Sequence, residues 1–286
     1  MIVPLSLVWF FSHRAFVAKG FRSRTLKVGA HEAHLYERTG AGSGPPVMLV
    51  HGMGGNAAGF LRILSGLLKA SRRVLLLELP GHGRARLPPG TKPATISECG
   101  RVLHTALLEV GEPAVLVGSS LGGALALSIA AQEPARVAGV VGLNPAGAPL
   151  AGAARLSVIH AFRGGTLRAA MQMTRRLFAR PPRGAWLVAG GLAAHWSSAP
   201  VQQFVAEMQT DVKGISPATL ASIRQPVLIL WGDSDALLPA SFPDYFAAHL
   251  KPGSVERLSG VGHLPMQEAS RAVAARLVRF LQELPA

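Results

Sequence analysis

Cysteine is nearly absent from the 286-residue sequence. Cys99 is the single one, so no disulfide can form within the chain. It falls in a predicted helix with no Cys or His at metal-ligand spacing around it, and we expect a small buried side chain there. Neither a cluster of metal ligands nor a cofactor-binding motif is visible along the chain. We therefore expect chemistry that needs no metal and no organic cofactor.

Acidic residues are scarce as well. The chain has 15 Asp and Glu against 29 Lys and Arg, a formal charge of +14. Such an excess favours acidic partners: nucleic acid, an anionic membrane or an anionic substrate. Aromatic residues make up only 6%, and no nucleic-acid-binding motif is present, so nucleic acid is not an expected partner. A possible anionic membrane surface and a merely solvated basic surface both remain open.

The N-terminus lacks a hydrophobic run long enough to span a bilayer. Residues 1–11 are apolar and aromatic, and His13, Arg14 and Lys19 follow. No basic residue precedes the run and no clear cleavage site follows it, which disfavours a signal peptide. We expect residues 1–23 to form a helix in a membrane interface. The alternatives are an export signal and a segment packed on the domain. The expected location is cytoplasmic or peripheral to a membrane, with export open, and the Ala-, Gly-, Leu- and Arg-rich composition indicates a bacterial source.

The remaining chain alternates apolar runs with helical patterns. Hydrophobic residues make up 49% and charged residues 15%, as in globular domains. Two alternating stretches predict an antiparallel pair of strands, and later runs predict strands buried on both faces. The pattern predicts an α/β fold with a mostly parallel sheet and helices on both faces. Predicted strands are 25–28, 33–37, 47–51, 73–78, 115–117, 137–143, 227–231 and 255–258; predicted helices are 57–68, 95–110, 124–131 and 271–284.

One long stretch breaks this alternation. Between Leu143 and Pro226 the periodicity is helical and no strand is evident. We predict a helical lid at residues 146–216, inserted into a core of residues 24–145 and 217–286. Arginines are frequent in it, and no acid occurs between Glu133 and Glu207. This basic character fits either a solvated helix face or a lid that meets anionic lipid or substrate.

The pattern Gly118-Ser119-Ser120-Leu121-Gly122 joins a β-branched run to a helix-forming stretch. In a strand–turn–helix context, Gly-x-Ser-x-Gly holds the serine on a strained turn with its hydroxyl exposed. Ser120 is therefore the candidate nucleophile, and the Leu121 amide at the helix start is a candidate anion donor. The alternative is a plain glycine-rich turn.

A second glycine-rich loop, His51-Gly52-Met53-Gly54-Gly55, follows an earlier buried run. Its glycines allow close approach of backbone to substrate. The Met53 amide, together with that of Leu121, can form an oxyanion hole; Gly54 is the neighbouring alternative donor. The loop can also be a tight connection without a catalytic role. Candidate substrate contacts nearby are Gly52, Gly54 and Ser119.

Acid and base candidates occur late in the chain. Asp233 and Asp235 both follow a buried strand, where a carboxylate can orient a histidine. His263 lies in a glycine-rich loop before the last helix and follows both the serine and the acids. Among the other histidines, we expect His13, His31 and His34 at the surface, and His51 and His82 as residues that shape loops. In the predicted lid, the candidates for substrate contact are His160, Met171 and Trp196, and His195 there can also contact substrate.

The chain order serine, acid, histidine is the order of α/β hydrolases. Residues 25–284 resemble the α/β-hydrolase fold superfamily, in its lidded group of esterases, lipases and C–C bond hydrolases. In such families the second acid of Gly-x-x-Asp-x-x-x-Pro is the triad member, which favours Asp235 over Asp233. Glu78 departs from the aspartate usual there, and we expect no catalytic consequence. The motifs that carry the resemblance are His51-Gly52-Met53-Gly54, Leu79-Pro80-Gly81-His82-Gly83, Gly118-Ser119-Ser120-Leu121-Gly122, Gly232 with Asp235 and Pro239, and Gly262-His263.

The resemblance implies a serine hydrolase that cleaves carboxylic esters with an apolar acyl group, through Ser120, Asp235 and His263. Its substrate would be a small-molecule ester or a lipid. A thioesterase, a C–C bond hydrolase or a perhydrolase on the same triad are the alternatives, and a non-catalytic membrane-associated binding protein is a more distant one. Acyl length, alcohol and oligomeric state stay open.

Overall fold

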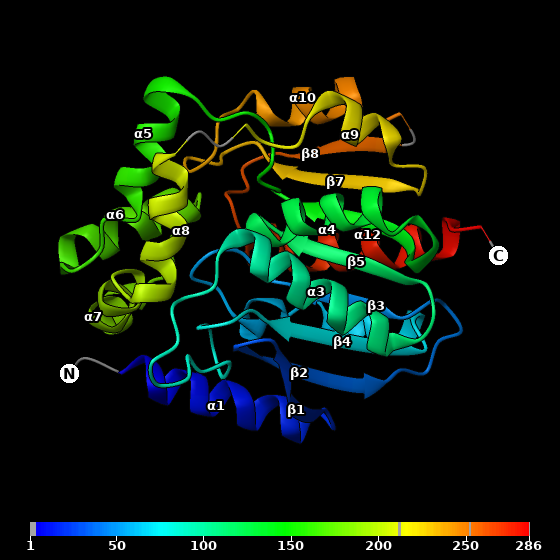
Figure 1. Cartoon of the computed structure of the whole chain (residues 1–286), viewed down its shortest axis with the longest axis horizontal. Coiled ribbons are helices and arrows are strands. Elements are labelled where there is room, and N and C mark those ends of the chain that lie inside the picture. Colours follow the sequence, from blue (N-terminus) through cyan, green and yellow to red (C-terminus); the bar gives the residue numbers. More distant parts are fainter. Residues whose placement is uncertain (1–3, 211–212, 252, 286) are drawn as a thin grey trace.

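The computed structural model of the chain describes residues 4–210, 213–251 and 253–285. Its centre is an eight-stranded sheet of order β1-β2-β4-β3-β5-β6-β7-β8 (Figure 1). Strands β3 to β8 are parallel, and β2 is antiparallel to both its neighbours, which confirms the predicted mostly parallel α/β fold. The strands are β1 Arg22–Val28, β2 His31–Thr39, β3 Val47–Val50, β4 Arg73–Glu78, β5 Ala114–Ser119, β6 Val137–Leu143, β7 Val227–Gly232 and β8 Gly253–Leu258.

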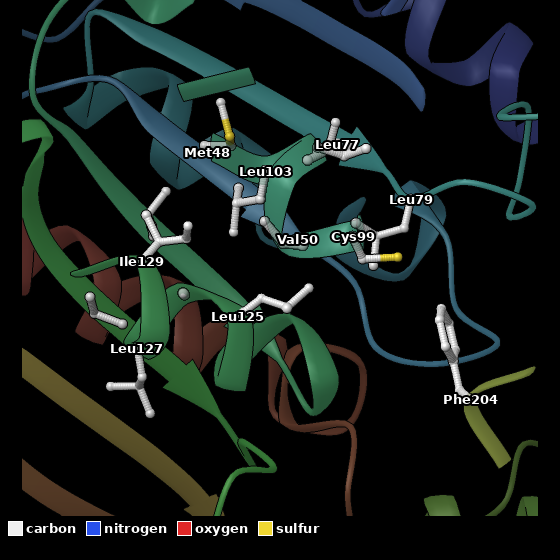
Figure 2. Packing of buried hydrophobic residues seen from close by; sticks show 14 of the residues in the cluster. Met48, Val50, Leu77, Leu79, Cys99, Leu103, Leu125, Leu127, Ile129 and Phe204 are labelled. Atoms are coloured by element: carbon white, nitrogen blue, oxygen red, sulfur yellow. The ribbon is translucent and has the colours of Figure 1, made fainter. Parts of the chain in front are cut away.

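The central strands are apolar throughout because both of their faces are covered. On β3, Met48 and Val50 join one core cluster while Val47 and Leu49 join the other, on the opposite face. Figure 2 shows the first of these clusters, where side chains of β3 and β4 lie close to those of two helices. These are α3 Ile96–Val110 and α4 Leu121–Gln132. Cys99 of α3 is buried there, as its sequence context predicted.

Helices cover both faces of the sheet. Thr95 and Glu98 form a reciprocal capping box at the start of α3, and Gly111 ends it with φ 78°. On the other face, α2 packs against α12. The predicted helix 57–68 divides into a 3₁₀ turn, η1 Ala57–Phe60, and α2, and the Asn56 side chain caps the turn. The remaining core helices are α2 Leu64–Ala70, α9 Pro217–Ser222, α10 Phe242–His249, α11 Pro265–Glu268 and α12 Ser270–Glu283.

Five helices lie between β6 and β7 in the described residues, and we call the first four, which fall within the predicted lid, the inserted helices. They are α5 Gly152–Ala161, α6 Leu167–Leu177, α7 Ala185–Trp196 and α8 Ala199–Gln209. Figure 1 shows them together beyond the carboxyl ends of the parallel strands. Within the described part of 144–226 no strand occurs. Residues 211–212 of the predicted lid, and residues 1–3 of the predicted N-terminal segment, lie outside the described residues.

The described part of the N-terminal segment is a helix, α1 Leu5–Ala18, that packs on the domain. Its Phe16 is 1% exposed and stacks on Tyr36 of β2, with ring centroids 4.4 Å apart. Its Trp9 meets His195 of α7 edge-on at 5.2 Å. No helix in the described ranges is both long and apolar enough to cross a membrane. The inner face of α1 thus packs on the domain, which is one of the three alternatives for this segment.

Two histidines of β2 are buried, contrary to the prediction. His31 and His34, expected at the surface, are only 8% and 6% exposed. Both lie on β2, which has a strand on either side. The His13 ring of α1 lies against His34, and the Nε2 of His31 is 3.4 Å from the Glu98 carboxylate of α3. Burial, together with the charge of Arg84, lowers the pKa of His34 to about 4. A helix that packs on a strand leaves no sign in the strand's own local sequence, so the burial of these two histidines could not be predicted from it.

Candidate active site

The candidate nucleophile stands on a strained turn between β5 and α4. Ser120 has φ 51°, a left-handed conformation that costs about 1–3 kcal/mol for a residue with a side chain. The turn closes tightly on both sides. A Cβ on Gly118 would lie 2.2 Å from the Gly122 carbonyl oxygen, and one on Gly122 would lie 2.2 Å from that of Val50. Glycine is required at both positions, which is the physical content of the Gly-x-Ser-x-Gly pattern.

The acid and base candidates meet at the carboxyl edge of the sheet. Asp235 follows β7, and its Oδ2 lies 2.7 Å from Nδ1 of His263, in the loop after β8. Their side chains are 1% and 2% exposed. The Asp235 Oδ1 accepts the amides of Leu237 at 2.8 Å and Leu238 at 3.0 Å. Burial alone would raise the pKa of Asp235, but His263 and these hydrogen bonds outweigh burial and hold it below its ordinary value.

Asp233 occupies a different position. Its side chain is exposed, and its Oδ1 accepts the Gly260 amide at 2.8 Å. This bond ties the loop after β7 to the loop after β8. Of the two carboxylates that the sequence left open, Asp235 is therefore the one in contact with His263, and Asp233 is a loop-shaping residue.

Asn144 is a third residue at this edge, and the sequence did not predict its role. It directly follows β6, is 0% exposed and has φ 41°. Its Nδ2 donates to Asp235 Oδ2 at 2.8 Å, and its Oδ1 accepts the Gly232 amide at 2.8 Å. The signal in the sequence was a polar residue at the end of a buried run. Its meaning depends on β6 being the neighbour of β7, which chain order alone does not reveal.

Two buried histidines shape the glycine-rich loop after β3. His82 accepts the Gly54 amide on Nε2 at 3.1 Å, and its Nδ1 bonds to the Pro80 carbonyl at 3.0 Å. His51 accepts the Leu79 amide on Nε2 at 3.0 Å. Burial lowers the pKa of His51 to about 4 and that of His82 to about 3, so both rings are neutral at pH 7. The roles agree with the loop-shaping function expected of them.

These bonds bear on the candidate oxyanion donors. Because the Gly54 amide donates to His82, it is engaged, and Met53 is the better placed of the two neighbours. Leu121 is the first residue of α4, and the first amides of a helix have no partner within it. Glu78 braces this region: its carboxylate accepts the amides of Ala57 at 3.1 Å and Arg84 at 2.8 Å. These are structural contacts, away from the Asp235–His263 pair.

Two cavities meet at Ser120. The first, of about 360 Å³, extends from Ser120 and His263 to the inserted helix α7. The second, of about 340 Å³, runs between α4 and the chain around Ile215 and has a mostly apolar lining that also includes Ser128 and Lys213. Both volumes are in the range of small-molecule sites. The two cavities share four lining residues: Met53, Ser120, Phe162 and Leu237.

The other predicted substrate contacts divide into two groups. Gly52, Gly54, Ser119 and Trp196 line the first cavity. His160 and Met171 line neither cavity, contrary to expectation. His160 is exposed because α5 turns its neighbours, Val158 and Ile159, inward, and Met171 packs against the apolar core cluster. The cavity-lining residues of α6 are instead Thr174 and Leu177.

His195 contacts the glycine-rich loop. Its Nε2 lies 3.1 Å from the Gly54 carbonyl, and burial lowers the pKa of His195. A neutral ring that donates from Nε2 fits this contact. In residues 4–210, 213–251 and 253–285, no group of three His, Cys, Asp or Glu is arranged to hold a metal ion.

Several known proteins are similar to this chain in sequence or in structure. The acetoin-cleaving system's dihydrolipoyllysine-residue acetyltransferase component, from Pseudomonas putida, is 28% identical over 93% of this chain and 71% of its own. Lipase 3 of a Moraxella species is 24% identical over 88% and 82%. A crystal structure of a membrane phospholipase A, a bacterial virulence factor, superimposes with a TM-score of 0.78 at 22% identity, covering 97% of this chain and 94% of its own.

Residues 47–276 match the alpha/beta hydrolase family, a span that includes the Ser120 turn, Asp235 and His263. The resemblance inferred from the motifs is confirmed by this match, which covers most of the chain. The chain belongs to the alpha/beta hydrolase family.

Proposed function

We propose that the protein is a serine hydrolase that cleaves carboxylic esters with an apolar acyl group. The observation that carries the proposal is the convergence of three elements on one cavity. Ser120 stands on its strained turn, His263 lines the same cavity, and Asp235 holds the far side of the His263 ring at 2.7 Å. Nucleophile, base and orienting acid in this arrangement are what acyl transfer through a serine requires.

In the proposed reaction, His263 Nε2 takes the Ser120 proton as Oγ attacks the ester carbonyl. His263 Nδ1–H stays bonded to Asp235, which stabilises the imidazolium. The amides of Met53 and Leu121 hold the oxyanion of the tetrahedral intermediate. The intermediate collapses, His263 returns its proton to the alcohol, and an acyl–Ser120 ester remains. Water, deprotonated by His263, then releases the acid and restores the serine.

The apolar second cavity supports an apolar substrate group, and lipase and phospholipase relatives support a lipid or small ester as the substrate class. We propose an anionic membrane surface as the place where the substrate is met. The excess of 14 positive charges supports this, as does the acid-free stretch between Glu133 and Glu207, which covers the inserted helices through α7. The same helices form the proposed lid over the cavity mouth.

The test offers purified protein p-nitrophenyl esters of graded acyl length, beside Ser120→Ala. We expect hydrolysis and covalent labelling of the wild type by a fluorophosphonate probe, and neither in the variant. Absence of turnover on every ester, together with absence of labelling, would refute the proposal. A thioester turned over faster than its matched ester would reassign the substrate class to thioesters.

A further inference from the structure

Helix α1 has two different faces. Its inner face holds Phe16 against Tyr36 and Trp9 against His195. Its outer face repeats at helical spacing, with large side chains left in solvent: Leu7, Phe10, Phe11 and Val17 are 44%, 52%, 61% and 48% exposed. Since the inner face already fixes the helix on the domain, the outer stripe contributes little to folding. We call these four residues and the exposed Arg14 between them the α1 stripe.

The α1 stripe belongs to a wider asymmetry. The described residues include eight large hydrophobic side chains that are strongly exposed. Four are in the stripe, three are on the inserted helices, and only Leu108 lies elsewhere. Contiguous exposed apolar surface marks a site of interaction with proteins or membranes. The three on the inserted helices are Leu156, Leu167 and Trp186.

Charge identifies the partner. The first 31 residues carry five Lys and Arg and no Asp or Glu. Arg14 lies within the stripe, and Lys19 is exposed at the end of the helix. In a symmetric dimer through the stripe, identical cationic surfaces would face each other, which opposes self-association. Aromatic side chains beside arginine and lysine match an anionic bilayer surface, where rings enter the interface and cations meet phosphate groups.

The stripe also stands next to the candidate site. Trp9, on the inner face of α1, contacts His195, whose Nε2 bonds to the Gly54 carbonyl. Gly54 lines the first cavity. One ring contact and one hydrogen bond therefore separate α1 from the cavity wall. A surface bound by α1 lies beside the active-site end of the molecule, where Figure 1 shows the inserted helices.

We propose that the α1 stripe is a docking surface for an anionic lipid bilayer, lying in its interface, and that it brings the first cavity to ester substrates held in that bilayer. The docking rests on the stripe alone. The delivery of substrate rests on the proposed ester hydrolysis, so the two parts are tested separately.

Docking is measured with Ser120→Ala protein, full length, by co-sedimentation with phosphatidylglycerol vesicles and with phosphatidylcholine vesicles. We expect binding to the anionic vesicles that weakens with salt. Phe10→Ser/Phe11→Ser should weaken it by at least about tenfold, because two half-exposed rings no longer enter the interface. Leu108→Ser, which removes an exposed side chain of α3, is the matched control and should bind as before. If Phe10→Ser/Phe11→Ser binds the anionic vesicles as strongly as Leu108→Ser does, the proposal is overturned.

Delivery is measured with the active protein on two forms of substrate, an ester embedded in phosphatidylglycerol vesicles and dissolved p-nitrophenyl butyrate. Phe10→Ser/Phe11→Ser should lose at least about tenfold in rate on the embedded ester and keep its rate on the dissolved one. Equal loss on both substrates would contradict the docking role. If the wild type hydrolyses neither ester, the proposed function fails while the vesicle-binding result still stands. A concentration-dependent dimer abolished by the double substitution would make the stripe a subunit interface and overturn the proposal.

Discussion

The carboxyl edge of the sheet differs from the region of α1 and the inserted helices in the side chains that each buries and exposes. At the sheet edge, polar groups are buried and paired: the side chains of Asp235 and His263 are 1% and 2% exposed and bonded to each other. Around α1 and the inserted helices, apolar groups are exposed, as with Phe11 at 61% and Trp186 at 60%. The proposed chemistry would depend on precise geometry in the first region, whereas the proposed membrane contact would depend on surface composition in the second.

Substitutions in the two regions should therefore have different effects. A substitution at the sheet edge alters partners within hydrogen-bond distance and should change rate or stability strongly. A substitution on the outer faces of α1 and the inserted helices removes few internal contacts and should act mainly through what the protein binds. The two regions meet at α7, where His195 contacts the glycine-rich loop and Trp196 lines the first cavity.

The largest expected effect lies at the acid. Asp235→Asn should lower kcat by about 10³- to 10⁴-fold, since the amide no longer holds the productive tautomer of His263. Asp233→Asn is the matched control, because it changes a carboxylate two residues away that contacts Gly260 and not His263. Steady-state kinetics of both variants on one ester check this. A greater loss in Asp233→Asn would reverse the assignment of the acid.

A smaller but sizeable effect concerns pH. His51 and His82 have folded pKa values of about 4 and about 3, against 6.5 for the free side chain. As the pH falls below 6.5 the unfolded chain takes up these protons first, so the free energy of unfolding decreases. At pH 5 the decrease is about 2 kcal/mol per histidine relative to pH 8. Well above pH 6.5 both histidines are neutral in the folded and in the unfolded chain, so they no longer change the free energy of unfolding.

Urea denaturation at pH 8 and pH 5 measures this loss. His82→Gln, which keeps a donor and an acceptor, should remove about 2 kcal/mol of the difference between the two pH values. Comparing variant with wild type cancels the titration of other groups. An unchanged difference would mean that His82 is not held neutral by burial.

Asn144 should show an intermediate effect. Asn144→Gly keeps a residue suited to φ 41° and removes the amide that Asp235 Oδ2 accepts; kcat should fall about tenfold with KM unchanged. Asn144→Ala removes the same amide but adds backbone strain. Equal kcat losses in the two variants would assign the effect to the lost hydrogen bond, whereas a loss confined to alanine would leave Asn144 with a purely conformational role.

The smallest effect is expected on the inserted helices. Trp186→Ala should change the free energy of unfolding by no more than about 0.5 kcal/mol, because the ring is 60% exposed. Trp231→Ala, of a ring 1% exposed on β7, should cost about 3–5 kcal/mol. Chemical denaturation of the two variants compares the regions directly. Similar losses would show that the Trp186 ring is packed, and would remove the contrast between the regions.

Local sequence predicted the sheet well because each central strand is a short apolar run bounded by glycine or polar loops. Because parallel strands end at one edge, it also placed the candidate serine, acids and histidine at that edge. The choice of Asp235 over Asp233 came from the family resemblance, and the contact between Asp235 and His263 agrees with it. Asn144 could not be found in this way, because its contact with Asp235 depends on β6 lying next to β7, and chain order does not reveal that neighbour. His160 and Met171 were placed wrongly because the face that α5 and α6 turn inward depends on the core they meet.

The two cavities at Ser120 are largely separate, since they share only Met53, Ser120, Phe162 and Leu237. This separation affects the order in which the alcohol leaves and water enters. An acyl group held in the apolar second cavity would stay there on Ser120 after the alcohol has left the first cavity. The emptied volume can then admit water, or a second alcohol, without displacing the acyl chain. Hydrolysis and acyl transfer would thus compete for the same space, and the ratio of acid to new ester would follow the concentration of added alcohol.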